Sequence, residues 1–116
     1  MVKGKIRILS ISNEPSVLAT RQIALQQLGY IVVSALGFAE ALQQCRSSAK
    51  FDFCILGSSL EGPERQALVP AFRAHSAGSV IVLKKNAEEN VQGADFAIAP
   101  AQLLPTLATV ATHIAA

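Results

Sequence analysis

The stretch ILSISNEPSVL, residues 8–18, joins an apolar strand to the start of a helix. The apolar run at residues 6–11 has the length of a strand, and its β-branched side chains favour extended backbone. Asn13 can then cap the first helical amides, and Pro15 suits an early helical position because its missing N–H costs nothing there. The stretch predicts a buried strand that turns into a helix, which we expect to close at Gly29.

Four more apolar runs of strand length follow, at residues 30–35, 51–56, 79–83 and 95–98. Segments with helical periodicity lie between or after them, at about residues 37–47, 63–75 and from Pro100 onward. Strands that alternate with helices and are apolar on both faces indicate a parallel sheet covered on both sides. We therefore expect an α/β, flavodoxin-like, doubly wound five-stranded parallel sheet with strand order 2-1-3-4-5.

The connection between the fourth and fifth runs, residues 84–94, is short. A crossover helix with its two loops usually takes at least about ten to twelve residues. The fourth helix is therefore expected to be shortened or absent. In the first helix, Leu18, Leu25 and Leu28 form the expected inward stripe, and in the third helix Leu68 and Phe72 do so.

Composition favours one compact domain that spans residues 1–116. The chain is 51% hydrophobic and 16% charged, which is more apolar than disordered sequences are. Its net charge is +2 and its basic residues are scattered, so nucleic-acid binding gains no support. The chain has no run near the roughly 20 apolar residues of a membrane span, and no signal peptide is expected.

The two cysteines, Cys45 and Cys54, fall within a predicted helix and a predicted strand. No second cysteine motif or neighbouring histidine completes a metal-ligand set. We interpret both as reduced thiols of the core, which suits a cytoplasmic protein without a metal.

In order and spacing, several stretches together resemble the receiver domains of two-component response regulators. They are residues 8–18, 28–32, 39–42, 51–56, 80–83, 93–96 and 98–100. The resemblance covers nearly the whole chain. It implies the receiver fold and a role in signal transduction through a protein partner.

The resemblance also identifies positions that carry phosphorylation in that family. An aspartate at the end of the third strand accepts the phosphoryl group, and here that position holds Gly57. Two adjacent carboxylates after the first strand hold Mg²⁺, and here Ser12 and Asn13 take their places, with Glu14 next. The nucleophile and the metal ligands are therefore absent.

Two further positions of that family differ as well. The threonine or serine after the fourth strand is replaced by Lys84, and the lysine after the fifth strand by Ala99. Phosphoryl transfer depends on positioning and charge neutralisation, so these losses together predict a receiver without the reaction. We expect a phosphorylation-independent pseudo-receiver that is not an enzyme, holds no cofactor or metal, and acts as a protein-interaction or regulatory module.

The fifth strand and its end keep two family features. Phe96 stands at the position of the switch aromatic, although a plain core aromatic is the alternative. On the resemblance alone, the Ala99–Pro100 peptide bond is expected to be cis.

The two lysines after the fourth strand allow two hypotheses. Lys84 or Lys85 reaches Glu14 and locks one conformation, or both are solvated and pair locally with Glu88 and Glu89. The runner-up function uses the same region: a flavodoxin-like domain that binds a small anionic ligand near Lys84, Lys85 and the Ser58–Ser59 loop.

The last helix is more apolar than one stripe requires. We expect a partner interface on it, which a homodimer could also use, at Leu104, Ala108, Ala111 and Ala115. The alternative is that these side chains pack within the domain.

Overall fold

The computed structural model describes residues 5–89 and 91–115, the last four of them as backbone only. A five-stranded parallel sheet, ordered β2-β1-β3-β4-β5, carries helices on both faces. The elements in chain order are β1 (Arg7–Ser12), α1 (Pro15–Gln27), β2 (Ile31–Leu36), α2 (Gly37–Cys45), β3 (Phe53–Leu56), α3 (Gly62–His75), β4 (Ser79–Leu83), β5 (Phe96–Ile98), the short helix η1 (Pro100–Gln102) and α4 (Leu103–Ala115). The predicted fold and strand order are confirmed.

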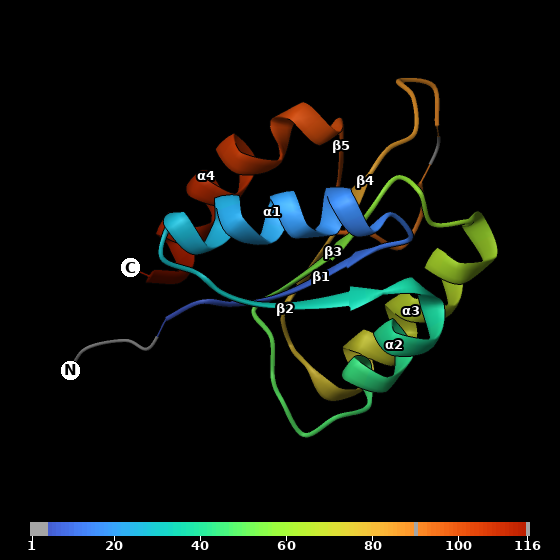
Figure 1. Cartoon of the computed structure of the whole chain (residues 1–116), viewed down its shortest axis with the longest axis horizontal. Coiled ribbons are helices and arrows are strands. Elements are labelled where there is room, and N and C mark those ends of the chain that lie inside the picture. Colours follow the sequence, from blue (N-terminus) through green and yellow to red (C-terminus); the bar gives the residue numbers. More distant parts are fainter. Residues whose placement is uncertain (1–4, 90, 116) are drawn as a thin grey trace.

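The sheet has α1 and α4 on one face and α2 and α3 on the other (Figure 1), and an apolar cluster lies on each face. Successive side chains of a strand point to opposite faces. In β3, Cys54 and Leu56 therefore join the cluster under α2 and α3, whereas Phe53 and Ile55 join the cluster under α1 and α4. All four β3 residues are buried, as expected of a central parallel strand.

The first helix is followed by the glycine that the sequence indicates as its stop signal. Gly29 has a φ of +93°, a left-handed conformation that other residues rarely adopt. The helix itself stops at Gln27, so Leu28 lies beyond its inward stripe and is 57% exposed. The prediction that Leu28 packs inward is therefore wrong, while Leu18 and Leu25 are buried as predicted.

The connection between β4 and β5 contains no helix in its described residues, in agreement with the prediction that the helix between these two strands is shortened or absent. It leaves the sheet edge as an extended loop (Figure 1). Arg73 of α3 fastens its far end, because Nη2 donates to the Gly93 carbonyl at 2.8 Å and to Asp95 Oδ2 at 3.1 Å. The loop is therefore held to α3 by side chains.

Cys45 and Cys54 are buried and unpaired, as predicted. Burial raises the pKa of the Cys45 thiol to about 11. Burial, followed by the nearby Cys45, raises the pKa of Cys54 well above its usual value. Both therefore stay protonated and unreactive at neutral pH. None of the described helices has the length and apolar character to cross a membrane.

Candidate functional site

The carboxyl ends of β1 and β3 lie side by side, and this brings the predicted positions together. Ile11 is in register with Leu56, so Ser12 and Gly57 are the next residues of adjacent strands. A Cβ at residue 57 would lie 3.5 Å from the Ser12 Cα. Ser12 and Gly57, which the resemblance places at the family's metal and nucleophile positions, thus lie at one edge of the sheet.

Gly57 stands where the backbone leaves no room for a side chain. Its N–H donates to the Ile11 carbonyl oxygen at 2.9 Å, and this bond draws the backbone after β3 close to β1. A Cβ at this position would lie 2.8 Å from the same oxygen, closer than real Cβ atoms approach backbone oxygen. An aspartate here would need the strands to shift, so the position is closed to the family's nucleophile.

A guanidinium lies beside this glycine. Arg21 of α1 donates from Nη1 to Ser10 Oγ at 3.2 Å and to the Ile11 carbonyl at 3.3 Å. Its Nη2 would be 3.5 Å from a Cβ at Gly57, and burial lowers the pKa of Arg21. Arg21 forms no ion pair within the described residues. A cation supported only by neutral oxygens therefore occupies the space next to the missing nucleophile.

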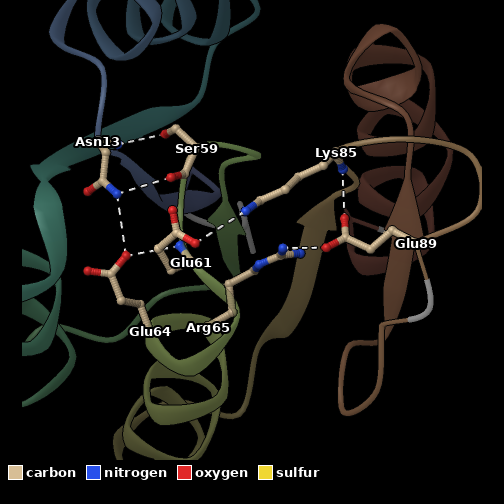
Figure 2. Close-up of polar contacts among 7 residues, drawn as sticks. All are labelled: Asn13, Ser59, Glu61, Glu64, Arg65, Lys85 and Glu89. Atoms are coloured by element: carbon tan, nitrogen blue, oxygen red, sulfur yellow. Dashed lines mark hydrogen bonds and ion pairs between the residues drawn. The ribbon is translucent and has the colours of Figure 1, made fainter.

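After β1, where receiver domains have a pair of carboxylates, Asn13 makes hydrogen bonds to Ser59 and Glu64 (Figure 2). Asn13 donates from its backbone N–H to Ser59 Oγ at 2.9 Å, and its Nδ2 donates to the Ser59 carbonyl at 3.1 Å and to Glu64 Oε1 at 3.3 Å. The hydroxyls of Ser12 and Ser59 lie 3.2 Å apart. These bonds tie the β1–α1 turn to the start of α3.

The same bonds correct the predicted cap of α1. The N-cap is Glu14, and it makes no side-chain cap bond. The Asn13 amide is engaged with the turn before α3, and Ser12 Oγ accepts the Glu14 N–H at 3.0 Å. Asn13 therefore joins two loops, because the turn at Ser59 offers it a backbone acceptor within reach.

These residues do not fit a magnesium site. Mg²⁺ requires oxygen ligands, usually with carboxylates among them. Ser12 and Ser59 are bound to each other, and Glu64 Oε1 accepts from Asn13 and from the Glu61 N–H. In the described chain, no cluster of three or more metal-binding side chains is found.

Neither lysine after β4 faces Glu14. Lys84 Nζ donates to the Ala87 carbonyl at 3.0 Å, and Lys85 Nζ lies 3.7 Å from Glu61 Oε2. The hypothesised pair with Glu14 is therefore wrong: short-range acceptors hold Lys84, and Lys85 reaches α3. Of the local partners predicted, Glu89 does contact Lys85, but through the backbone N–H, at 2.7 Å.

An ion pair that the sequence did not predict, Arg65 with Glu89, also joins α3 to the β4–β5 connection (Figure 2). Arg65 is 6% exposed, and its Nη2 donates to Glu89 Oε2 at 2.5 Å. The hydrogen bond from Arg65, and next that from Lys85, lower the pKa of Glu89. Within the described residues Arg65 Nε has no hydrogen-bond partner, and such a buried orphan typically costs about 1–3 kcal/mol.

The predicted positions in and after β5 are Phe96, Ala99 and the Ala99–Pro100 peptide bond. Phe96 is half-buried and packs against the cluster under α1 and α4. Ala99 is the exposed N-cap of η1, where its N–H donates to Gln102 Oε1 at 3.3 Å. No described peptide bond is cis, so the expected cis Ala99–Pro100 bond is wrong. Pro100 opens a helical turn, a position that suits a trans proline.

The four residues of the expected interface on α4 differ in their exposure to solvent. Leu104 is 40% exposed and Ala108 is exposed, whereas Ala111 is 8% exposed and belongs to the interior. The Ala115 side chain lies outside the described residues. Of these four residues, Leu104 and Ala108 are thus the two that are described on the outer surface of this helix.

No protein-family model and no curated protein matches the chain. Solved structures of receiver domains do match its fold. The response regulator TrrA from Thermotoga maritima, in complex with Mg²⁺ and BeF, is 21% identical with a TM-score of 0.74, over 93% of this chain and 97% of that one. A CheY-like receiver domain from Methylobacillus flagellatus is 18% identical with a TM-score of 0.76, over 92% of this chain and 99% of that one.

A third match is a chain in the complex of the histidine kinase ThkA with TrrA. It is 21% identical with a TM-score of 0.72, over 92% of this chain and 97% of that one. The chain thus has the fold of response-regulator receiver domains. Because the sequence identities are low, this likeness shows the fold alone.

Proposed function

We propose that this chain is a single receiver-like domain, residues 1–116, that works without phosphorylation as a protein-interaction or regulatory module in signal transduction. The observation that carries the proposal is the closed position at Gly57, where the Ile11 carbonyl would lie 2.8 Å from any Cβ. Glycine offers no nucleophile, and the backbone leaves no space for one.

The surroundings of Gly57 support the same proposal. Phosphoryl transfer needs a positioned nucleophile and cations that neutralise the developing charge. Ser12 and Asn13 offer neutral groups that are already hydrogen-bonded, Lys84 is turned to the Ala87 carbonyl, and Ala99 offers a methyl group. We therefore propose that the module is not an enzyme and holds no cofactor.

The proposed partner is a signalling protein. TrrA, which shares the fold, was crystallised with the histidine kinase ThkA, so a receiver-like surface of this kind can serve protein docking. The exposed Leu104 and Ala108 of α4 are candidates for part of that surface, in a heteromeric contact or a homodimer. Two buried, unpaired thiols fit the cytoplasmic location that we propose.

A second candidate is the binding of a small anion by the lysines after β4. Lys84 and Lys85 line a cleft of about 340 Å³ together with the start of η1. Their ammonium groups already contact the Ala87 carbonyl and Glu61, which weakens this candidate. Stabilisation by inorganic phosphate in a thermal-shift assay, lost in the Lys84→Gln variant, would favour it.

Incubation with acetyl phosphate and Mg²⁺, followed by intact mass measurement, tests the main proposal. The wild-type protein is expected to carry no phosphoryl adduct. The Gly57→Asp variant, measured in parallel, is also expected to carry none, because the metal ligands are missing as well. A stoichiometric adduct on the wild type would overturn the proposal.

A further inference from the structure

A cleft of about 710 Å³ lies between α3 and the β4–β5 connection. Val69, Pro70 and Val91 give it apolar walls, and Gln66 and Gln92 add amide groups. The connection takes the place of a fourth helix, so a loop rather than a packed helix closes this side of the molecule. The cleft is separate from the closed edge at Gly57.

Arg65 is the cation of this cleft: of the described residues that line it, no other is positively charged. A guanidinium presents Nε and Nη2 along one edge, and a carboxylate can accept from both at once. Glu89 accepts only from Nη2, because its other oxygen accepts the Lys85 backbone N–H at 2.7 Å. Nε is left buried without a partner.

We propose that this cleft binds an acidic side chain of a partner polypeptide, whose carboxylate displaces Glu89 and accepts from both Nε and Nη2 of Arg65. Glu89 is then an internal competitor that holds the site until the partner arrives. The inference rests on the proposed function, since it names the chemistry of the proposed protein partner.

A peptide fits the cleft better than a free acid does. The apolar walls at Val69, Pro70 and Val91 suit apolar side chains on either side of the acidic residue. The amides of Gln66 and Gln92 can pair with peptide N–H and C=O groups, which a small carboxylate lacks. A single cation in the lining matches a single carboxylate, so one acidic residue is the expected recognition element.

Displacement of Glu89 is feasible because its side chain is already 20% exposed at the edge of the ion pair. Once released, its carboxylate gains water, while Arg65 exchanges one hydrogen bond for two. The Lys85 N–H is exposed to solvent and can be hydrated as well.

The experiment titrates the ¹⁵N-labelled protein with acetyl-Val-Glu-Val-amide and, separately, with acetyl-Val-Gln-Val-amide. The Glu peptide is expected to shift the amides of Arg65, Gln66, Val91 and Gln92 in a saturable way, and the Gln peptide is not. In the Glu89→Gln variant the Glu peptide is expected to bind about five- to tenfold more tightly, because its competitor has lost its charge.

The Glu88→Gln variant is the matched control. Glu88 is the exposed neighbour of Glu89, the change in net charge is the same, and its side chain lines no part of the cleft. Its affinity for the Glu peptide is expected to equal that of the wild type.

Equal affinities of the Glu89→Gln and Glu88→Gln variants, or equal binding of the two peptides, would overturn the inference. Pentanoate that binds as tightly as the Glu peptide would overturn the assignment to a polypeptide. None of these results bears on phosphorylation, which the acetyl phosphate experiment decides separately, so a failure of either proposal can be recognised.

Discussion

The end of β3 and the β4–β5 connection are both closed in this structure, but by different means. At Gly57 the closure is backbone against backbone, through the Ile11 carbonyl. At the connection it is made by side chains, and its most buried contact is the ion pair of Arg65 with Glu89, which leaves a buried N–H unpaired. The first closure cannot open unless strands move, whereas the second can exchange one carboxylate for another. The regulation that we propose therefore belongs to the connection.

Adding one methyl group at Gly57 should have the largest effect. Gly57→Ala places a Cβ 2.8 Å from the Ile11 carbonyl, so β1 and β3 must separate locally. Overpacking of this kind costs about 1–3 kcal/mol in the free energy of unfolding, and we expect the upper part of that range because the obstacle is backbone. Urea unfolding measures it.

Gly62 provides the matched control. It lies at the start of α3, and a Cβ there meets nothing within 4 Å. Gly62→Ala should leave stability unchanged or raise it by up to about 1 kcal/mol, since alanine has less freedom to lose on folding. If both variants unfold at the same urea concentration, the end of β3 is not closed as described.

The Glu89→Gln variant should have the next largest effect, and one that depends on pH. In the wild type, the hydrogen bond from Arg65 lowers the pKa of Glu89, so the unfolded state takes up the proton first as pH falls. The stabilisation is fully present above the ordinary pKa of 4.5 and is lost as pH falls through the lower native value.

At pH 7 the variant should lose about 1–2 kcal/mol, a value discounted because Glu89 is partly exposed. The difference from the wild type should shrink as pH falls from 4.5 through the lower native pKa of Glu89. Urea midpoints from neutral pH to pH 3 measure it, with Glu88→Gln as the reference. A difference that stays constant with pH would contradict the role given to the Glu89 charge.

Lys85→Gln should have the smallest effect. The Lys85 ammonium lies 3.7 Å from Glu61, both side chains are exposed, and such pairs contribute about 0–1 kcal/mol. We expect a loss of no more than about 0.5 kcal/mol in the free energy of unfolding. In the wild type, 0.5 M salt should screen the pair and remove the same small stabilisation. A loss as large as that of Glu89→Gln would mean that the exposed pair also holds the connection.

The order and spacing of apolar runs were enough to predict the sheet, its strand order and the missing fourth helix. They also placed Gly57 and Ser12 at one edge, because the carboxyl ends of parallel strands meet there. Hydrophobic periodicity identifies which strands exist and where they end. It does not show how closely two backbones approach, so the contact of Gly57 with Ile11 was not predictable.

The side-chain partners of the charged residues were harder to predict. Lys84 and Glu14 are near the same edge, yet the chain turns at Ala87 so that Lys84 meets a carbonyl instead. Such partners depend on loop geometry, which composition does not determine.

The positions of two arginines in the sequence do carry a signal of burial. Arg21 lies three residues after Leu18, and Arg65 lies three residues before Leu68. Each arginine therefore shares the inward stripe of its helix with buried leucines; Arg65 is buried and Arg21 is half-buried. A cation on an apolar helix face indicates a buried polar contact, although it does not identify the partner.

The measurement that tests the central claim most directly is the response of backbone amides to Mg²⁺ and beryllofluoride, the pair bound in the TrrA structure. A closed end of β3 predicts no saturable shift in the ¹⁵N spectrum at residues 12–14, 57–59 and 84–86, up to millimolar reagent. Saturable shifts at these amides, centred on Gly57, would show that the site still accepts the metal and the phosphoryl mimic and would contradict the account.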